Sequence, residues 1–194
     1  MLTPKQNFLE TLKKDGKPDR LANNYTAFKP VGGDPVFQFV RGNRIRGTYS
    51  YDRWGTYIAF PEDQPAATPI VTAENQVIQD IEEWQKYVKV PDLRGNCSEG
   101  WETALANKAA IDSEKYFSTT VMGTGIFEQL HMLMTFEDTL CNLLLYPDEM
   151  HELIDVITEY RLEYMKLIVE NLHPDAIISH HEGGTKTSLF MAPD

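Results

Sequence analysis

The sequence feature that most constrains the fold is a strand, a run of helices and a second strand within residues 116–180. An apolar run from Tyr116 to Met122 predicts a buried strand, which ends at a Gly-Thr-Gly turn over 123–125. A second short apolar strand is expected at 175–180. Strands that are separated by helices pair in parallel, and the functional side chains of such sheets lie at the carboxyl ends of the strands. The pattern therefore predicts an α/β protein.

Two helices are expected between these strands. Thr135 is placed to cap a helix over 136–145, with Asp138 at the position that completes a capping box. A longer helix is expected over 147–172, and His173-Pro174 should end it. Its apolar side chains recur at the spacing of one helix face. They are Met150, Leu153, Ile154, Ile157, Tyr164, Leu167, Ile168 and Leu172.

The first half of the chain has weaker patterns. The stretch Thr3-Pro4-Lys5-Gln6 predicts a capped helix start, and a short strand is expected at 22–28. Residues 35–60 are rich in β-branched and aromatic residues and predict a group of strands. Apolar spacing predicts amphipathic helices at 77–88 and 101–111.

Composition limits the classes of protein that this chain fits. With 194 residues and 42% hydrophobic content, we expect a single soluble domain over 1–194. The formal net charge of −11 argues against a nucleic-acid partner or binding to an anionic membrane. Cys97 and Cys141 have neither the spacing of a metal site nor that of a disulfide framework, and residues 1–5 lack a signal-type apolar core. We therefore expect a reduced, cytoplasmic protein.

Four stretches together resemble the uroporphyrinogen decarboxylase superfamily. They are LTPKQNFLETLKKDGKPDRL, YDRWGTYIAF, FEDTLCNLLLYPDEMHELIDVITEY and GTKTSLFMAPD, and they occur in the family's order over essentially all 194 residues. The resemblance implies a TIM-type (β/α)₈ barrel. This chain resembles the N-terminal half of that barrel, with a β-rich insertion between the first and second barrel strands.

Departures from the family pattern favour one branch of it. The decarboxylases carry a pair of arginines after the first strand, and this chain has no such pair before Arg41. The resemblance therefore argues against porphyrinogen decarboxylation. It favours the methyltransferases, which move a methyl group between a corrinoid protein and a thiol or tetrahydrofolate. The thiol-using members bind zinc through a His-x-Cys pair, which neither Cys97 nor Cys141 belongs to, so we expect no zinc in this chain.

The resemblance also points to catalytic residues at the end of the third strand. Many methyltransferase members have Asp-Asp-Trp-Gly where this chain has His181-Glu182-Gly183-Gly184, so acidic character remains only at Glu182. In a tetrahydrofolate-using enzyme, Glu182 and His180 would manage the proton on the accepting nitrogen. The alternative is a hydrogen-bonded polar strand end without catalytic function.

Five further residues are candidates for binding the cofactor. Asn24 and Tyr25 belong to the expected first strand, where Asn24 would position a pterin. Met122 and Gly123 end the second strand, and glycine there would let a ligand approach the backbone. His181 is the fifth candidate for binding the cofactor. The alternatives are core packing for Tyr25 and a plain strand-to-helix turn at 122–125.

The expected strand count leaves two hypotheses about function. Only three barrel strands are expected, at 22–28, 116–122 and 175–180, whereas a closed barrel has eight strands and about 250 residues. The first hypothesis is a truncated methyltransferase that needs a corrinoid protein and a complementary C-terminal half, and that is inactive alone. The second is a non-catalytic half-barrel that functions only by self-association or by pairing with a C-terminal half. Because an incomplete sheet leaves open edges, both predict that the chain is a homo-oligomer or pairs with another chain.

Overall fold

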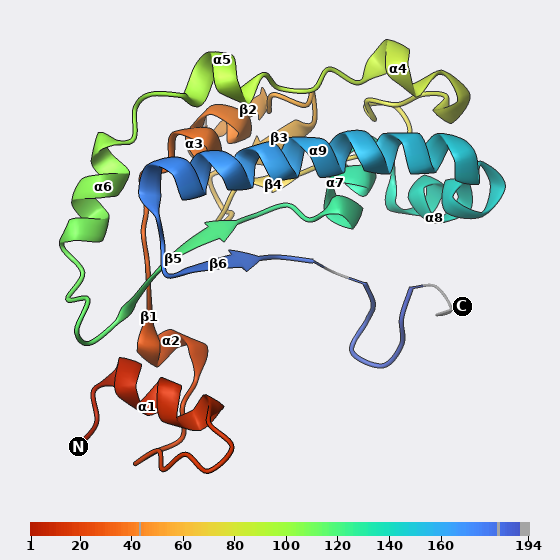
Figure 1. Ribbon diagram of the computed structural model, residues 1–194. Coiled ribbons are helices and arrows are strands. Elements are labelled where there is room, and N and C mark those ends of the chain that lie inside the picture. The colour runs from red at the N-terminus through yellow and green to blue at the C-terminus, as the bar shows by residue number, and fades with distance from the viewer. Residues whose placement is uncertain (43, 182, 191–194) are drawn as a thin grey trace.

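The computed structural model describes residues 1–42, 44–181 and 183–190, and it describes residues 24 and 25 by their backbone alone. It is a mixed α/β structure with two three-stranded sheets (Figure 1). The first sheet has the order β1-β5-β6, from Phe28–Pro30, Phe117–Met122 and Ala176–Ser179. The second sheet has the order β2-β3-β4, from Thr48–Tyr51, Tyr57–Phe60 and Thr68–Pro69.

The first sheet is parallel throughout, which confirms the α/β class. Phe28 pairs with Phe117 at the start of β5, and Val121 pairs with Ile178 near its end. The two strands expected in the second half of the chain are therefore confirmed. The antiparallel second sheet lies between β1 and β5 in the chain, where the β-rich insertion was expected.

The long helix α9, Pro147–Leu172, crosses the molecule along one face of the parallel sheet (Figure 1). Helix α8, Phe136–Leu145, precedes it, and the hydroxyl of Thr135 accepts the N–H of Asp138 at 3.1 Å, as the capping pattern predicted. Both predicted helices are thus confirmed.

Two clusters of buried side chains form the core, and α9 contributes to both because its apolar stripe runs its full length. The cluster at the C-terminal half of α9 contains Val31, Val36, Leu93, Cys97, Trp101, Ala104, Met122, Tyr164, Leu167, Ile168 and Leu172. The cluster at its N-terminal half contains Trp54, Ile78, Ile81, Trp84, Leu130, Leu133, Met134, Met150, Leu153 and Ile157.

The strand expected at 22–28 is wrong for most of its length. Helix α1, Pro4–Leu12, begins with the predicted capping box at Thr3, but residues Asn24–Ala27 form the short helix α2. The side chain of Asn23 accepts the N–H of Thr26 at 3.1 Å, which favours a helical turn here. Pairing with β5 begins only at Phe28.

The β-strand expected directly after Pro35 is also wrong. Residues Pro35–Arg41 form helix α3, because the carboxylate of Asp34 accepts the N–H groups of Val36 at 2.8 Å and Phe37 at 3.4 Å. Asp followed by Pro is a common helix start, and this signal outweighs the β propensity of the residues that follow. The later strands of the segment, β2 and β3, are confirmed.

Four short helices lie in the middle of the chain. They are α4 Trp84–Tyr87, α5 Leu93–Cys97, α6 Glu102–Ala109 and α7 Ile126–Leu133. Helix α6 confirms the expectation at 101–111.

The helix expected over 77–88 is confined to the 3₁₀ turn Ile81–Glu83 and to α4. Ile78 lies outside any helix because its N–H donates to the carbonyl oxygen of Leu133 at 2.8 Å.

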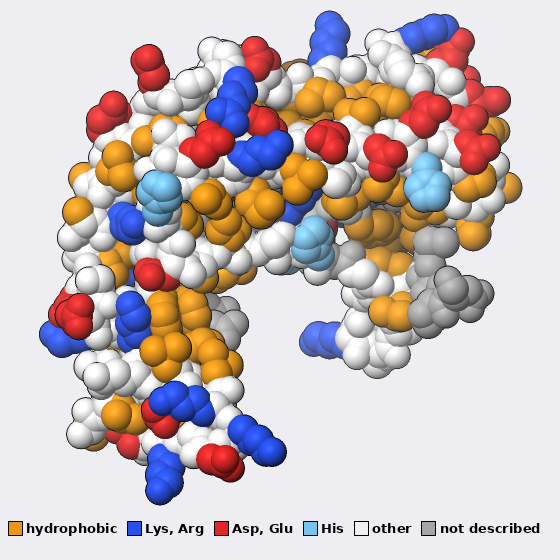
Figure 2. Space-filling view, viewed as in Figure 1, with side chains coloured by type: hydrophobic (Ala, Val, Ile, Leu, Met, Phe, Trp, Pro, Cys, Tyr) orange, Lys and Arg blue, Asp and Glu red, His pale blue; other side chains and the backbone are white. Residues whose placement is uncertain are grey.

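Helix α9 covers one face of the parallel sheet (Figure 1), and on the opposite face the ring of Phe8, from α1, packs against Phe28 and Phe117 at the start of β1 and β5. On the opposite face, Val121 and Ile178 are neighbours across β5 and β6, and they are 44% and 42% exposed. Figure 2 shows hydrophobic side chains that extend from the body of the molecule onto the N-terminal segment. None of the helices in the described part of the chain has the length and apolar character needed to cross a bilayer.

Candidate functional site

A pocket with a volume of about 300 Å³ lies beside the carboxyl end of β5. Parallel sheets place binding sites at this end, and the volume is at the lower limit of small-molecule pockets. Helices α3, α7 and α9 and the β2–β4 segment contribute the walls. The lining residues are Phe37, Val40, Arg41, Arg44, Asp52, Trp54, Ile58, Pro69, Gly123, Thr124, Gln129, Met132, Ile157, Tyr160, Arg161 and Tyr164.

Two half-buried arginines line the pocket on the side of α3. The guanidinium of Arg41 lies over the ring of Phe37, 4.1 Å from its centroid, and Arg44 donates from Nη1 to the carbonyl oxygen of Ala67 at 3.1 Å. Burial, together with the nearby charge of Arg44, lowers the pKa of Arg41 to about 10. Burial likewise lowers the pKa of Arg44, against the attraction of Asp52.

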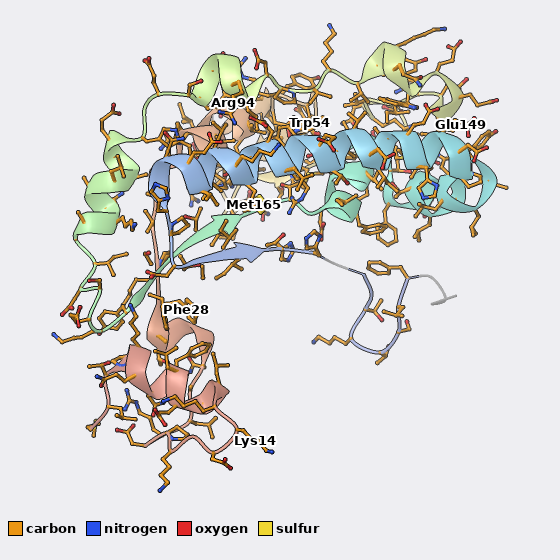
Figure 3. All side chains as sticks on the ribbon, in the orientation of Figure 1. Lys14, Phe28, Trp54, Arg94, Glu149 and Met165 are labelled. Atoms are coloured by element: carbon orange, nitrogen blue, oxygen red, sulfur yellow. The ribbon has the colours of Figure 1, made fainter. Side chains whose placement is uncertain are left out.

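Asp52 and Trp54 form the wall on the side of the second sheet. One carboxylate oxygen of Asp52 accepts the N–H groups of Trp54 and Thr56, each at 2.9 Å, and so holds the tight turn before β3. Burial raises the pKa of Asp52, although these hydrogen bonds oppose the shift. The turn places Trp54 beside α9 (Figure 3). Its ring meets that of Tyr160 edge to face, with the ring centroids 4.8 Å apart.

Arg161 connects the pocket with the ends of β5 and β6. This residue of α9 is 7% exposed, and its guanidinium donates to the carbonyl oxygens of Gly123 and Thr124. Its other terminal nitrogen donates to the hydroxyl of Ser179 at 2.7 Å, on β6. A single buried charge thereby holds two strand ends and α9 together.

The turn after β5 has an unusual backbone that this arrangement requires. Thr124 has φ of 56°, a left-handed conformation that is rare for a β-branched residue. A β-carbon at Gly125 would lie 2.5 Å from the carbonyl oxygen of His180 and 2.8 Å from Nδ1 of His181. Only glycine therefore allows α7 to begin so close to the end of β6. Strained backbone of this kind is often found at functional sites.

Both histidines at the end of β6 lie next to the start of α7. Nδ1 of His180 is 3.7 Å from a carboxylate oxygen of Glu128, which is 5% exposed, while the His180 side chain is 56% exposed. Nε2 of His181 is 2.7 Å from the hydroxyl of Ser179. A buried carboxylate beside an exposed imidazole is an arrangement suited to proton transfer.

Two more buried polar side chains adjoin the pocket. Tyr164 lines it and donates its hydroxyl to the carboxylate of Asp34, the residue that caps α3. Gln129 also lines it, and its amide nitrogen has no hydrogen-bond partner among the residues that the structure describes. An unpartnered buried donor of this kind suits a ligand that brings an acceptor.

The structure brings together three of the residues that the sequence singled out. His180, His181 and Gly123 all lie at the strand ends around Arg161 and α7. Met122 instead packs into the core cluster beside α9, with 6% exposure. Its cofactor-binding role stays a prediction.

The remaining predicted site residues are less well placed. Glu182 lies outside the described residues. Asn24 and Tyr25 belong to α2 and not to the first strand, and their side chains are outside the described part. Their roles also stay predictions.

Sequence reasoning missed the charged residues of the site. Arg161 carried a usable signal, because it lies four residues after Ile157 and three before Tyr164, on the buried stripe of α9. A charged residue on the apolar face of a helix is rarely buried without a specific role. Glu128 and Gln129 had no comparable signal, since no helix was predicted over 126–133.

No group of three or more potential metal ligands is found within the described residues, and the expectation of no zinc stays a prediction. Comparison of the chain with family models, curated proteins and solved structures found no match.

Proposed function

We propose that this chain supplies part of the active site of a methyltransferase, and that the pocket beside β5 holds the methyl acceptor. The observation that carries the proposal is Arg161, which lines the pocket and also holds the ends of β5 and β6. A ligand in the pocket is thereby placed next to the polar strand ends. The sequence resemblance supplies the reaction type.

The proposal treats β1, β5 and β6 as the first three strands of an incomplete (β/α)₈ barrel. Their parallel order follows their order in the chain, as in such a barrel. A C-terminal half from another chain, or a second copy, would complete the walls around the strand ends. We expect the isolated chain to bind the acceptor but not to catalyse transfer of a methyl group to it.

In this proposal the methyl donor is the corrinoid of a partner protein, which is too large for a cavity of about 300 Å³ and docks at the strand ends. Tetrahydrofolate or a thiol is the acceptor. Methyl transfer requires the acceptor to be oriented and shielded from water, which the aromatic walls around Trp54 and Tyr160 favour. His180, positioned by Glu128 through Nδ1, would exchange a proton with the acceptor.

Binding of the acceptor tests this proposal. Trp54 lines the pocket, and the other two tryptophans, Trp84 and Trp101, do not, so intrinsic fluorescence reports on ligands there. We expect tetrahydrofolate or a small thiol to change the emission of the wild-type chain and not that of Trp54→Phe. Arg161→Met should weaken binding about tenfold, whereas Arg94→Met, on the opposite side of α9 and paired with Glu163 and Glu170, should not. Absence of binding by both acceptors would contradict the proposal.

The alternative function is association through the open face of the sheet. The exposure of Val121 and Ile178, two apolar neighbours near the carboxyl ends of β5 and β6, favours it. In that case the chain is a non-catalytic half-barrel that acts by pairing with itself, and neither acceptor should bind.

A further inference from the structure

Arg41 and Arg44 are two positive charges that form no salt bridge with an acidic side chain of the described residues, although Asp52 attracts Arg44. Neither forms an ion pair within 1–42, 44–181 and 183–190, whereas Arg94 and Arg20 on the surface both do. Both are half-buried, and each lines the pocket. Like charges that are held together in a half-buried site oppose folding, so a binding role would explain their position.

We propose that Arg41 and Arg44 bind the carboxylate of a small organic acid whose apolar, ring-sized body occupies the pocket. The inference rests on the proposed function, which places the ligand beside the strand ends. It goes beyond that function, because it names a further class of ligand for the pocket, distinct from tetrahydrofolate and from a simple thiol.

Contacts hold both guanidinium groups beside the pocket and leave one donor of Arg44 without a partner. Nε of Arg44 is buried without a hydrogen-bond partner among the described residues, while its Nη1 is held by Ala67. Arg41 is held against the ring of Phe37. Guanidinium forks match the geometry of a carboxylate, and bound oxygen atoms would satisfy the buried donor.

The charge of the lining favours a single carboxylate over a dianion. Asp52 is the one acidic residue among the lining residues described, and its charge acts on Arg44. With Asp52 ionised, this group of three carries one net positive charge. The charge of Arg161 is not counted in this group, because the carboxylate of Glu128 attracts it. A monoanion would therefore balance the charge of the pair.

The walls favour an apolar ring over a small inorganic anion. Phe37, Trp54 and Tyr160 contribute aromatic surface, and Ile58, Met132 and Ile157 contribute aliphatic surface. Inorganic phosphate would leave this surface without contacts. A single ring fits a cavity of about 300 Å³, whereas a four-ring porphyrinogen exceeds it.

Benzoate and benzamide form a matched pair of probes, because they have the same shape and only benzoate is charged. We expect calorimetry of the wild-type chain to show benzoate binding at least tenfold tighter than benzamide. Arg41→Gln and Arg44→Gln should each weaken benzoate binding about tenfold and leave benzamide unchanged. Arg44→Lys should recover part of the loss. Arg46→Gln is the control, because Arg46 is exposed and does not line the pocket.

Stability without ligand gives a second readout. If Arg41 serves binding, Arg41→Gln should leave the melting temperature unchanged or raise it, because a repulsion is removed. A marked fall in the melting temperature would assign Arg41 a structural role and overturn the inference. So would equal binding of the two probes, failure of both to bind, or inorganic phosphate binding as tightly as benzoate. If tetrahydrofolate or a thiol still binds, the proposed function survives the failure of this inference.

Discussion

Asp34 joins α3 and α9 through one carboxylate. It is 5% exposed, caps α3 through the N–H groups of Val36 and Phe37, and accepts the hydroxyl of Tyr164 on α9. Burial raises the pKa of Asp34 above its ordinary value of 3.8, although these hydrogen bonds oppose the shift. This residue therefore orients α3, and with it Arg41, relative to α9.

The raised pKa of Asp34 predicts a specific pH dependence of stability. Because the folded state binds the proton more tightly than the unfolded state, Asp34 stabilises the fold most below pH 3.8. That stabilisation is lost as the pH rises through the raised pKa. Asp34→Asn removes the titration and keeps most hydrogen bonds. We therefore expect the melting temperature of the variant, relative to wild type, to increase as the pH rises from 3.5 to 7.

Asp112 supplies a control of opposite sign for this measurement. Its hydrogen bond with Lys115 lowers the pKa of this exposed carboxyl. Relative to wild type, Asp112→Asn should therefore lose stability as the pH rises. A difference between Asp34→Asn and wild type that stays constant over the whole pH range would contradict the prediction for Asp34.

At the scale of elements, α9 organises the molecule. Its apolar stripe is long enough to enter both core clusters, and the same face presents Arg161 and Tyr164 to the pocket. The chain leaves α9 through His173, whose left-handed backbone and the following proline end the helix. Folding of the site thus depends on the packing of this helix.

Two leucines of α9 test this dependence in a matched pair. Leu153 is 0% exposed in the core, whereas Leu162 is 37% exposed on the same helix. We expect Leu153→Ala to reduce the free energy of unfolding by about 2–5 kcal/mol, since it removes buried contacts and leaves a cavity. Leu162→Ala should cost less than about 1 kcal/mol. Urea denaturation at one protein concentration measures both, and equal losses would show that α9 does not pack as described.

At the scale of the whole molecule, the parallel sheet is covered by α9 on one face and is only partly covered on the other, where Phe8 of α1 packs against Phe28 and Phe117. Helix α9 covers one face of the sheet (Figure 1), the face that carries Met122. Val121 and Ile178, on the opposite face, are exposed. Stable soluble proteins rarely leave neighbouring apolar side chains of a sheet open to water. The open face is therefore the surface at which we expect another chain to bind.

We predict that the chain is not a monomer in solution at micromolar concentration. Burial of the open face supplies the driving force, and a homodimer is the simplest closed arrangement. Val121→Lys should weaken this association, because it places a charge on that face. Val169→Lys is the matched control, since Val169 is 47% exposed on α9, outside the sheet. Light scattering measures the mass, and a wild-type mass of 22.2 kDa with a cooperative melt would contradict the prediction.

The sequence by itself determined the elements whose signals are local and strong. Capping boxes and long apolar stripes predicted α1, α8 and α9, and a buried apolar run predicted β5. Parallel pairing followed from the alternation of strands and helices. These features depend on neighbours in the chain, so the pattern of residues is sufficient to predict them.

Tertiary structure decided the short elements and the pocket. Residues 36–40 fit a strand as well as a helix, and the contact of Asp34 with Tyr164, 130 positions away, stabilises the helix. Likewise, the N–H of Ile78 donates to the carbonyl oxygen of Leu133, and Ile78 is not part of the helix that its apolar spacing predicted. The pocket joins Arg41, Asp52 and Arg161 from distant segments, and no local pattern predicts that they meet. Burial and long-range hydrogen bonds select among conformations that the local sequence leaves close in energy.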